Sequence, residues 1–136
     1  MKTEQRFLND LYVIKTSHSE SVNKLTVQVA INREHSIFKG HFPGNPILPG
    51  AATLQMLKEI LAEHIGQQVI LSRAANIKYL SFINPDKIRA IDFDIDLKET
   101  GPGVLSCNAT VHNEDTVFCS FRGEFRTIEY SNTEFH

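Results

Sequence analysis

Residues 38–57 read FKGHFPGNPILPGAATLQML, and this stretch decides how the rest of the chain is interpreted. Three glycines and three prolines fall within the eleven positions 40–50, around a single histidine, His41. Proline fixes φ and removes a backbone donor, whereas glycine permits tight turns and the close approach of a ligand. So dense a mixture predicts a loop that is held rigid outside any strand ladder, as a binding site requires.

An amphipathic helix is predicted directly after this loop, over about residues 51–65. Leu54, Leu57 and Leu61 recur at spacings of three and four, and Gly66 supplies a stop signal. Gly50 lies where the helix begins, so its backbone N–H is one of the donors that a helix leaves unpaired at its positive end. Such an N–H can hold a carbonyl oxygen as negative charge builds on it.

The segments on either side of the loop and helix are typical of strands. Two β-branched runs, 11–18 and 24–32, predict a hairpin around the polar turn SESVN. Four strands are expected after the helix, with turns at NPDK and GPG, over residues 68–83, 88–99, 104–112 and 116–128. One helix cannot cover both faces of such a sheet, so we predict an α+β fold in which an antiparallel sheet curls around the helix. Pairing with a second copy is the simplest cover for its edge.

Composition narrows the class of protein. The 136 residues suit one domain, 1–136, with a polar C-terminal tail at about 129–136. The net charge is −2 with both signs interspersed, no apolar run approaches the roughly 20 residues of a membrane span, and the N-terminus lacks a secretory pattern. Cys107 and Cys119 are too few for a disulfide framework and are expected to be buried thiols. We therefore predict a soluble, cytoplasmic protein.

The segment GHFPGNPILPG resembles the signature of the hotdog-fold 3-hydroxyacyl-(acyl-carrier-protein) dehydratases, the FabZ/FabA-like family. That signature reads Gly-His-Phe-Pro, two variable residues, Pro-Ile/Val, one residue, and Pro-Gly. Eight positions match it: Gly40, His41, Phe42, Pro43, Pro46, Ile47, Pro49 and Gly50. The segment IKYLSFINPDK looks more loosely like the family's Lys-Phe-x-x-Pro-Val-x-Pro-Gly-Asp strand and turn.

The resemblance implies a hotdog fold, a curved antiparallel sheet around one long central helix, in a protein that is at least dimeric. It implies removal of water from a 3-hydroxyacyl thioester on the phosphopantetheine arm of an acyl carrier protein, in fatty-acid or related polyene and lipid biosynthesis. His41 matches the general base, and Gly50 matches the residue whose N–H binds the thioester oxygen. The family's acid lies fourteen residues after the histidine and faces the histidine of the other subunit. No metal, nucleotide or other cofactor is implied.

Gln55 occupies the position of that acid, which is a departure from the family pattern. A glutamine has no titratable proton near neutral pH, although it can still hydrogen-bond a hydroxyl. Several interpretations stay open. His41 can take and return the proton while Gln55 orients the hydroxyl, or Glu59, one helical turn further on, can supply the acid. Alternatively the chain is a non-catalytic acyl-thioester-binding or dimer-partner subunit, an acyl thioesterase, or a subunit that receives its acid from a different hotdog protein in a heterodimer.

The residues around His41 complete the predicted site. Phe38, Phe42, Pro43 and Pro49 are the predicted substrate-binding residues. For the two phenylalanines, lining an acyl tunnel and packing the loop onto the helix are equally open. An acidic carrier protein would need a basic rim around the entrance. The candidates for this rim are Arg33, Lys39, Arg73 and Lys78.

Overall fold

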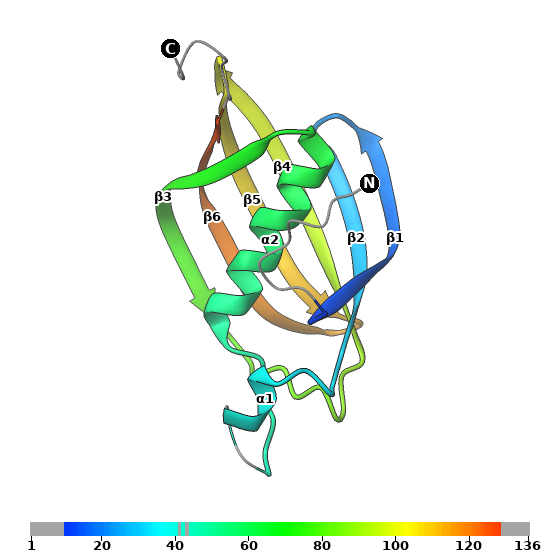
Figure 1. The fold of residues 1–136 in the computed structure, drawn as a ribbon. Helices are drawn as coiled ribbons and strands as arrows, with labels where there is room; N and C mark the ends of the chain where they lie inside the picture. Colours follow the sequence, from blue (N-terminus) through cyan, green and yellow to red (C-terminus); the bar gives the residue numbers. More distant parts are fainter. Residues whose placement is uncertain (1–9, 41, 43, 129–136) are drawn as a thin grey trace, which may run out of the picture.

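One long helix, α2 (Gly50–Ile65), lies along the hollow of a strongly curved sheet (Figure 1). The computed structural model describes residues 10–40, 42 and 44–128, so the predicted tail at 129–136 lies outside the described residues. Gly66 ends the helix in the left-handed conformation, at φ 83°, and its N–H donates to the carbonyl oxygen of Ala62. Glycine adopts this conformation without steric cost, so the predicted stop is confirmed.

The sheet contains six antiparallel strands in the order β1-β2-β4-β5-β6-β3. β1 and β3 are its edges. Figure 1 shows both edge strands curling toward the helix from opposite sides. The strand bounds are β1 Tyr12–Ser21, β2 Lys24–Ile31, β3 Gln68–Tyr79, β4 Ala90–Gly101, β5 Val104–Asn113 and β6 Thr116–Ile128.

The core forms between the helix and the concave face of the sheet. Strand alternation supplies one half of it: in β4, Phe93 is fully buried while its neighbours Asp92 and Asp94 are not. The helix supplies the other half. Its buried side chains are Ala52, Thr53, Met56, Leu57, Ile60 and Leu61. The buried side chains thus fix which face of α2 meets the sheet and which face stays available for other contacts.

The succession of two strands, one long helix and four strands along the chain is as predicted from the sequence, and so is the α+β class. The position of β3 in the sheet, paired with β6 at the far edge and not with β4, was not predicted. The prediction that the third strand runs to residue 83 is wrong. The ladder ends at Tyr79 because the N–H groups of Leu80 and Ser81 both donate to one carbonyl oxygen, that of Phe118, at 2.8 and 3.3 Å. The chain then leaves the sheet and returns toward the loop that precedes α2.

Two further features bear on the sequence analysis. Cys107 and Cys119 are buried and free, as predicted, and Cys119 lies opposite Val111 in the ladder rather than opposite the other thiol. No helix within residues 10–40, 42 and 44–128 is both long and apolar enough to cross a membrane.

Candidate active site

A single helical turn, α1 (Ile37–Gly40), opens the glycine- and proline-rich loop, and the sequence analysis did not predict it. His35 caps this turn, because its Nδ1 accepts the N–H of Ile37 at 3.0 Å. Phe38 projects from the turn into the core and is 3% exposed. The start of the loop is therefore anchored by one capping contact and one buried ring.

A second tight turn follows at residues 42–45. The N–H groups of Phe42 and Asn45 each donate to the other residue's carbonyl oxygen, at 3.1 and 2.9 Å. Gly44 sits inside this turn at φ 75°, where a residue with a Cβ would be strained. His41 and Pro43 lie outside the described residues, so their predicted roles as base and substrate-binding residue stay predictions.

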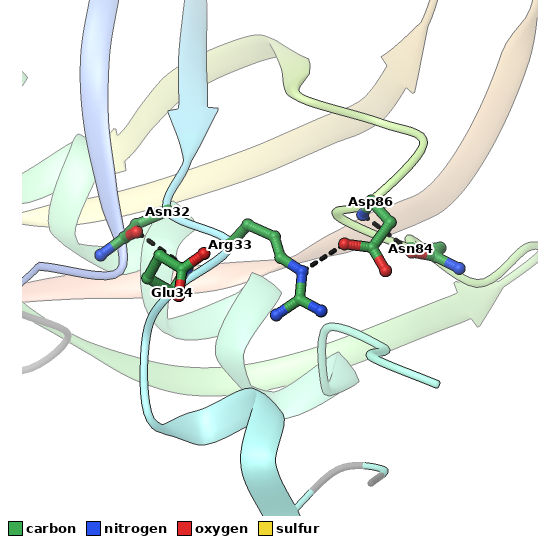
Figure 2. A network of polar contacts seen from close by, with 5 residues as sticks. All are labelled: Asn32, Arg33, Glu34, Asn84 and Asp86. Carbon is green, nitrogen blue, oxygen red and sulfur yellow. Dashed lines mark hydrogen bonds and ion pairs between the residues drawn. The ribbon is translucent and has the colours of Figure 1, made fainter. Parts of the chain in front are cut away.

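The loop is tied to the segment between β3 and β4. The N–H of Leu48 donates to the carbonyl oxygen of Ile83 at 2.9 Å. On the other side of α1, Arg33 Nε pairs with Asp86 Oδ1 (Figure 2). These two contacts lie on either side of the glycine- and proline-rich loop at positions 40–50, which we call the motif loop. A shift of the motif loop would therefore also move residues 80–86.

Each partner of this ion pair lies in a turn that a side chain braces. Asn32 Oδ1 accepts the N–H of Glu34 at 2.9 Å, and Asn84 Oδ1 accepts the N–H of Asp86 at 2.8 Å (Figure 2). Asparagine side chains commonly fold turns in this way. The sequence analysis named Arg33 as a candidate for a basic rim that would bind an acyl carrier protein. In the structure Arg33 forms an intramolecular ion pair with Asp86, next to the motif loop.

Gly50 is the first residue of α2, as the sequence analysis placed it. Pro49 precedes it in an extended conformation, at φ −63° and ψ 144°, and α2 has no side-chain cap. The carbonyl oxygen of Pro49 accepts the N–H groups of Ala52 and Thr53, at 3.0 and 3.3 Å. The N–H groups of Gly50 and Ala51 precede those donors at the positive helix end, where a carbonyl oxygen of a ligand can accept from them.

The space beside Gly50 is filled by an aromatic ring that the sequence analysis did not single out. A Cβ placed on Gly50 would lie 2.7 Å from two ring carbons of Tyr79 and 3.1 Å from its hydroxyl oxygen. Tyr79 ends β3 and is 54% exposed. Burial raises the pKa of its phenol, and Cys119 contributes in the same direction. The absence of a Cβ at position 50 therefore admits this ring.

Gln55 joins a hydrogen-bonded network with two residues. Its Nε2 donates to Glu59 Oε2 at 3.1 Å, and the Tyr12 hydroxyl donates to Glu59 Oε1 at 2.7 Å. Gln55 and Glu59 are half-buried, and Tyr12 is 3% exposed. The structure thus brings Gln55 and Glu59 together, as their spacing of four predicted, and adds Tyr12 from β1. Tyr12 lies 47 positions from Glu59, and no local pattern links the two.

The network decides how the Gln55 amide is oriented. Both carboxylate oxygens of Glu59 accept a hydrogen bond, and an ionised carboxylate has nothing to donate. The amide must therefore turn its NH₂ group toward Glu59. Its carbonyl oxygen, an acceptor with two lone pairs, faces away from Glu59. At position 55 the chain therefore offers a hydrogen-bond acceptor whose orientation is set by Glu59.

A cavity of about 300 Å³ lies against the motif loop. Phe38 and Phe42 line it together with Pro46, and Arg33 and Lys39 contribute charge. Phe38 is buried and Phe42 is 47% exposed, so the two rings contribute unequally to the wall. Glu34 and His35 also line this cavity, so its wall mixes apolar, acidic and basic side chains.

A larger cavity, of about 800 Å³, opens at the other end of α2, next to His64, Ile65 and Leu97. None of the predicted site residues lines it. Within the described part of the chain, no group of three or more His, Cys, Asp or Glu side chains is arranged to hold a metal ion.

Comparison with known proteins places the chain in a family. The profile described as ApeI-like, ApeI dehydratase, matches residues 17–122. A protein named 3-hydroxyacyl-[acyl-carrier-protein] dehydratase FabZ from Lactobacillus helveticus is 28% identical over 102 residues, which span 70% of this chain and 66% of that protein. The match thus spans just under two thirds of that relative's length. The FabZ protein of Lactococcus lactis is 30% identical over 110 residues, which span 74% of this chain and 72% of that protein.

Solved structures confirm the hotdog fold. A chain of the dehydratase heterocomplex ApeI:P from Xenorhabdus doucetiae superimposes with a TM-score of 0.68, over 84% of this chain and 96% of that one, at 16% identity. The α+β prediction and the resemblance to the FabZ-like dehydratases are therefore both confirmed.

Proposed function

The chain belongs to the ApeI-like dehydratase family, and we propose that it removes water from a 3-hydroxyacyl thioester carried by an acyl carrier protein. The observation that carries the proposal is the junction between the motif loop and α2. There the motif ends at a helix start without a side-chain cap, where the Gly50 N–H can donate a hydrogen bond to a ligand oxygen. The product is the corresponding 2-enoyl thioester.

The proposed reaction begins with His41, which takes the proton on the carbon next to the thioester carbonyl. The electron pair moves onto the thioester oxygen, where the Gly50 N–H and the positive end of α2 stabilise the developing charge. The enolate then collapses, the bond from carbon 3 to the hydroxyl breaks, and the hydroxyl leaves as water after accepting a proton. General acid–base help of this kind commonly contributes ~10²–10⁴-fold.

Gln55 shapes the second half of this reaction. Its oriented carbonyl oxygen accepts the hydrogen of the substrate's 3-hydroxyl, so an oxygen lone pair of that hydroxyl turns toward the protonated His41. His41 then returns the proton that it took. Glu59 acts as a positioning residue in this scheme, because both of its oxygens already accept hydrogen bonds from Gln55 and Tyr12.

A second subunit is part of the proposal. β3 is an edge strand of twelve residues, and its burial pattern is exposed almost throughout. Ile70 and Leu71 on this strand are 43% and 41% exposed. A long edge with apolar side chains pairs readily with another chain. We expect light scattering to give the mass of a dimer for the wild type and a smaller mass for the charged variant Ile70→Asp.

The second chain can also be a different protein. The amide at position 55 favours this variant of the proposal, because a hotdog partner with a carboxylic acid at that position would supply the missing proton. The similarity to a chain of the dehydratase heterocomplex ApeI:P supports it as well. In that arrangement this chain contributes His41 and Gly50, and its partner contributes the acid.

Product analysis tests the proposal. The purified chain is mixed with 3-hydroxybutyryl thioester on acyl carrier protein, and the reaction is followed by ultraviolet absorbance of the enoyl thioester and, separately, by release of free thiol. Enoyl formation without thiol release supports the dehydratase. Thiol release identifies a thioesterase, and binding without either product identifies a binding subunit. Turnover that appears only with a second hotdog protein present supports the heteromeric form.

A further inference from the structure

We propose that the Tyr79 hydroxyl is a second hydrogen-bond donor for the thioester oxygen, beside the Gly50 N–H. This inference rests on the proposed function and assigns a catalytic residue that the dehydratase motif does not contain. It follows from where the ring lies, from the state of its hydroxyl and from the residue type that the motif has at this position.

The geometry places the phenol at the start of α2. The hydroxyl oxygen is 3.1 Å from the point that a Cβ on Gly50 would occupy. A Cα–Cβ bond in a helix tilts toward the N-terminus, which is the direction in which the free N–H groups also point. Adding a carbon–carbon bond of ~1.5 Å puts the hydroxyl within about 4.6 Å of the Gly50 Cα. The Gly50 nitrogen is one further bond of ~1.5 Å away, so the two donors lie at most about 6 Å apart, which two hydrogen bonds of ~3 Å to one oxygen can span.

The hydroxyl is available to donate. Among residues 10–40, 42 and 44–128, no hydrogen-bond partner of the Tyr79 side chain is found, although its ring is partly covered by Gly50. The raised pKa keeps the phenol protonated at neutral pH and above, so it remains a donor. By contrast, the hydroxyl of Tyr12 is already committed to Glu59.

The sequence supplies an independent argument. Lys78 and Tyr79 align with the Lys-Phe pair of the strand motif, so this chain carries a phenol where the motif carries a plain phenyl ring. Packing against Gly50 needs only the ring, which phenylalanine also provides. The added oxygen therefore has no packing role in the described structure. This chain lacks the acid at position 55, which would help the hydroxyl to leave. A second donor to the enolate oxygen would compensate by lowering the barrier to the other step, proton abstraction.

The first test is kinetic and uses Tyr79→Phe, which keeps the ring against Gly50 and removes only the oxygen. We expect kcat to fall about tenfold or more while KM changes by less than about twofold, because the bond strengthens as charge develops on the oxygen. A variant with wild-type kcat overturns the inference. The proposed function is unaffected by that result as long as the wild type forms enoyl thioester.

The second test needs no turnover. Butyryl-pantetheine thioester labelled with ¹³C at the carbonyl is bound to the protein, and its stretching band is recorded by infrared difference spectroscopy. Two donors lower the frequency more than one, so we expect Tyr79→Phe to move the band back toward its value in water. Tyr12→Phe is the matched control, and we expect it to leave the band in place. Equal bands in the wild type and Tyr79→Phe, or no binding by the wild type, overturn the inference even if the chain proves inactive.

Discussion

Replacing Gln55 by glutamate turns the amide–carboxylate contact in the helix into a contact between two carboxyl groups. The present distance between Gln55 Nε2 and Glu59 Oε2 is 3.1 Å. Two unit charges at that distance repel by about 5 kcal/mol at an effective dielectric constant of 20. The site is half-buried, and the side chains can separate or share a proton, so we expect a net loss of about 1–3 kcal/mol in the free energy of unfolding at pH 8.

The sign of the pH dependence follows from linkage. In the folded variant the pair retains one proton, so the introduced carboxyl group has a pKa above the roughly 4.3 of a free glutamate. At a pH between the unfolded-state pKa of about 4.3 and the higher folded-state pKa, the unfolded chain binds fewer protons than the folded chain. Below about pH 4 the Gln55→Glu variant therefore keeps its full stability relative to the wild type. It loses stability as pH rises through the folded-state pKa of the introduced carboxyl group.

Urea denaturation at pH 4.5 and pH 8 measures this effect for the wild type and for Gln55→Glu. The double variant Gln55→Glu/Glu59→Gln is the matched control, because it restores one amide facing one carboxylate. We expect it to recover most of the stability that Gln55→Glu loses at pH 8, because one amide again faces one carboxylate, although the Tyr12 hydroxyl then donates to an uncharged amide oxygen. A Gln55→Glu variant whose stability difference is the same at both pH values would refute the proposed network.

Two further predictions concern the core. Phe93 is fully buried on β4. Phe93→Ala should therefore lower the free energy of unfolding, measured by urea denaturation, by about 3–5 kcal/mol. A loss under about 1 kcal/mol would contradict the place of Phe93 in the core. Burial raises the pKa of the Cys107 thiol to about 12, and Cys119 is 2% exposed, so a disulfide reagent at pH 8 should label neither thiol until the protein is denatured. Fast labelling of the folded chain would contradict this.

Local sequence patterns were enough to predict the central helix, the order of the elements along the chain and the α+β class, but not the place of β3 beside β6. The alternation of Ile91, Phe93 and Ile95 indicated a half-buried strand, and these three residues are buried. The end of β3 was misplaced because it depends on a carbonyl oxygen of β6, which is distant in the sequence. Residue spacing carries no information about such a contact.

The candidate site was predictable where its residues are close in sequence. Gly50 was placed at the start of α2 by the loop and helix pattern, and the contact of Gln55 with Glu59 follows from helical spacing. Tyr12 and Tyr79 were missed, because each meets the helix only through the curvature of the sheet. The phenylalanine-to-tyrosine departure in the strand motif was the one available signal for Tyr79.

The most direct test of the account compares dehydration by the wild type, His41→Ala and His35→Ala, using 3-hydroxybutyryl thioester on acyl carrier protein. His35 is the control, because it lies in the same loop and its ring caps α1. We expect His41→Ala to lower the rate by about 10²-fold or more and His35→Ala to stay within about threefold of the wild type. A His41→Ala variant that turns over at the wild-type rate would contradict the proposed base and, with it, the proposed mechanism.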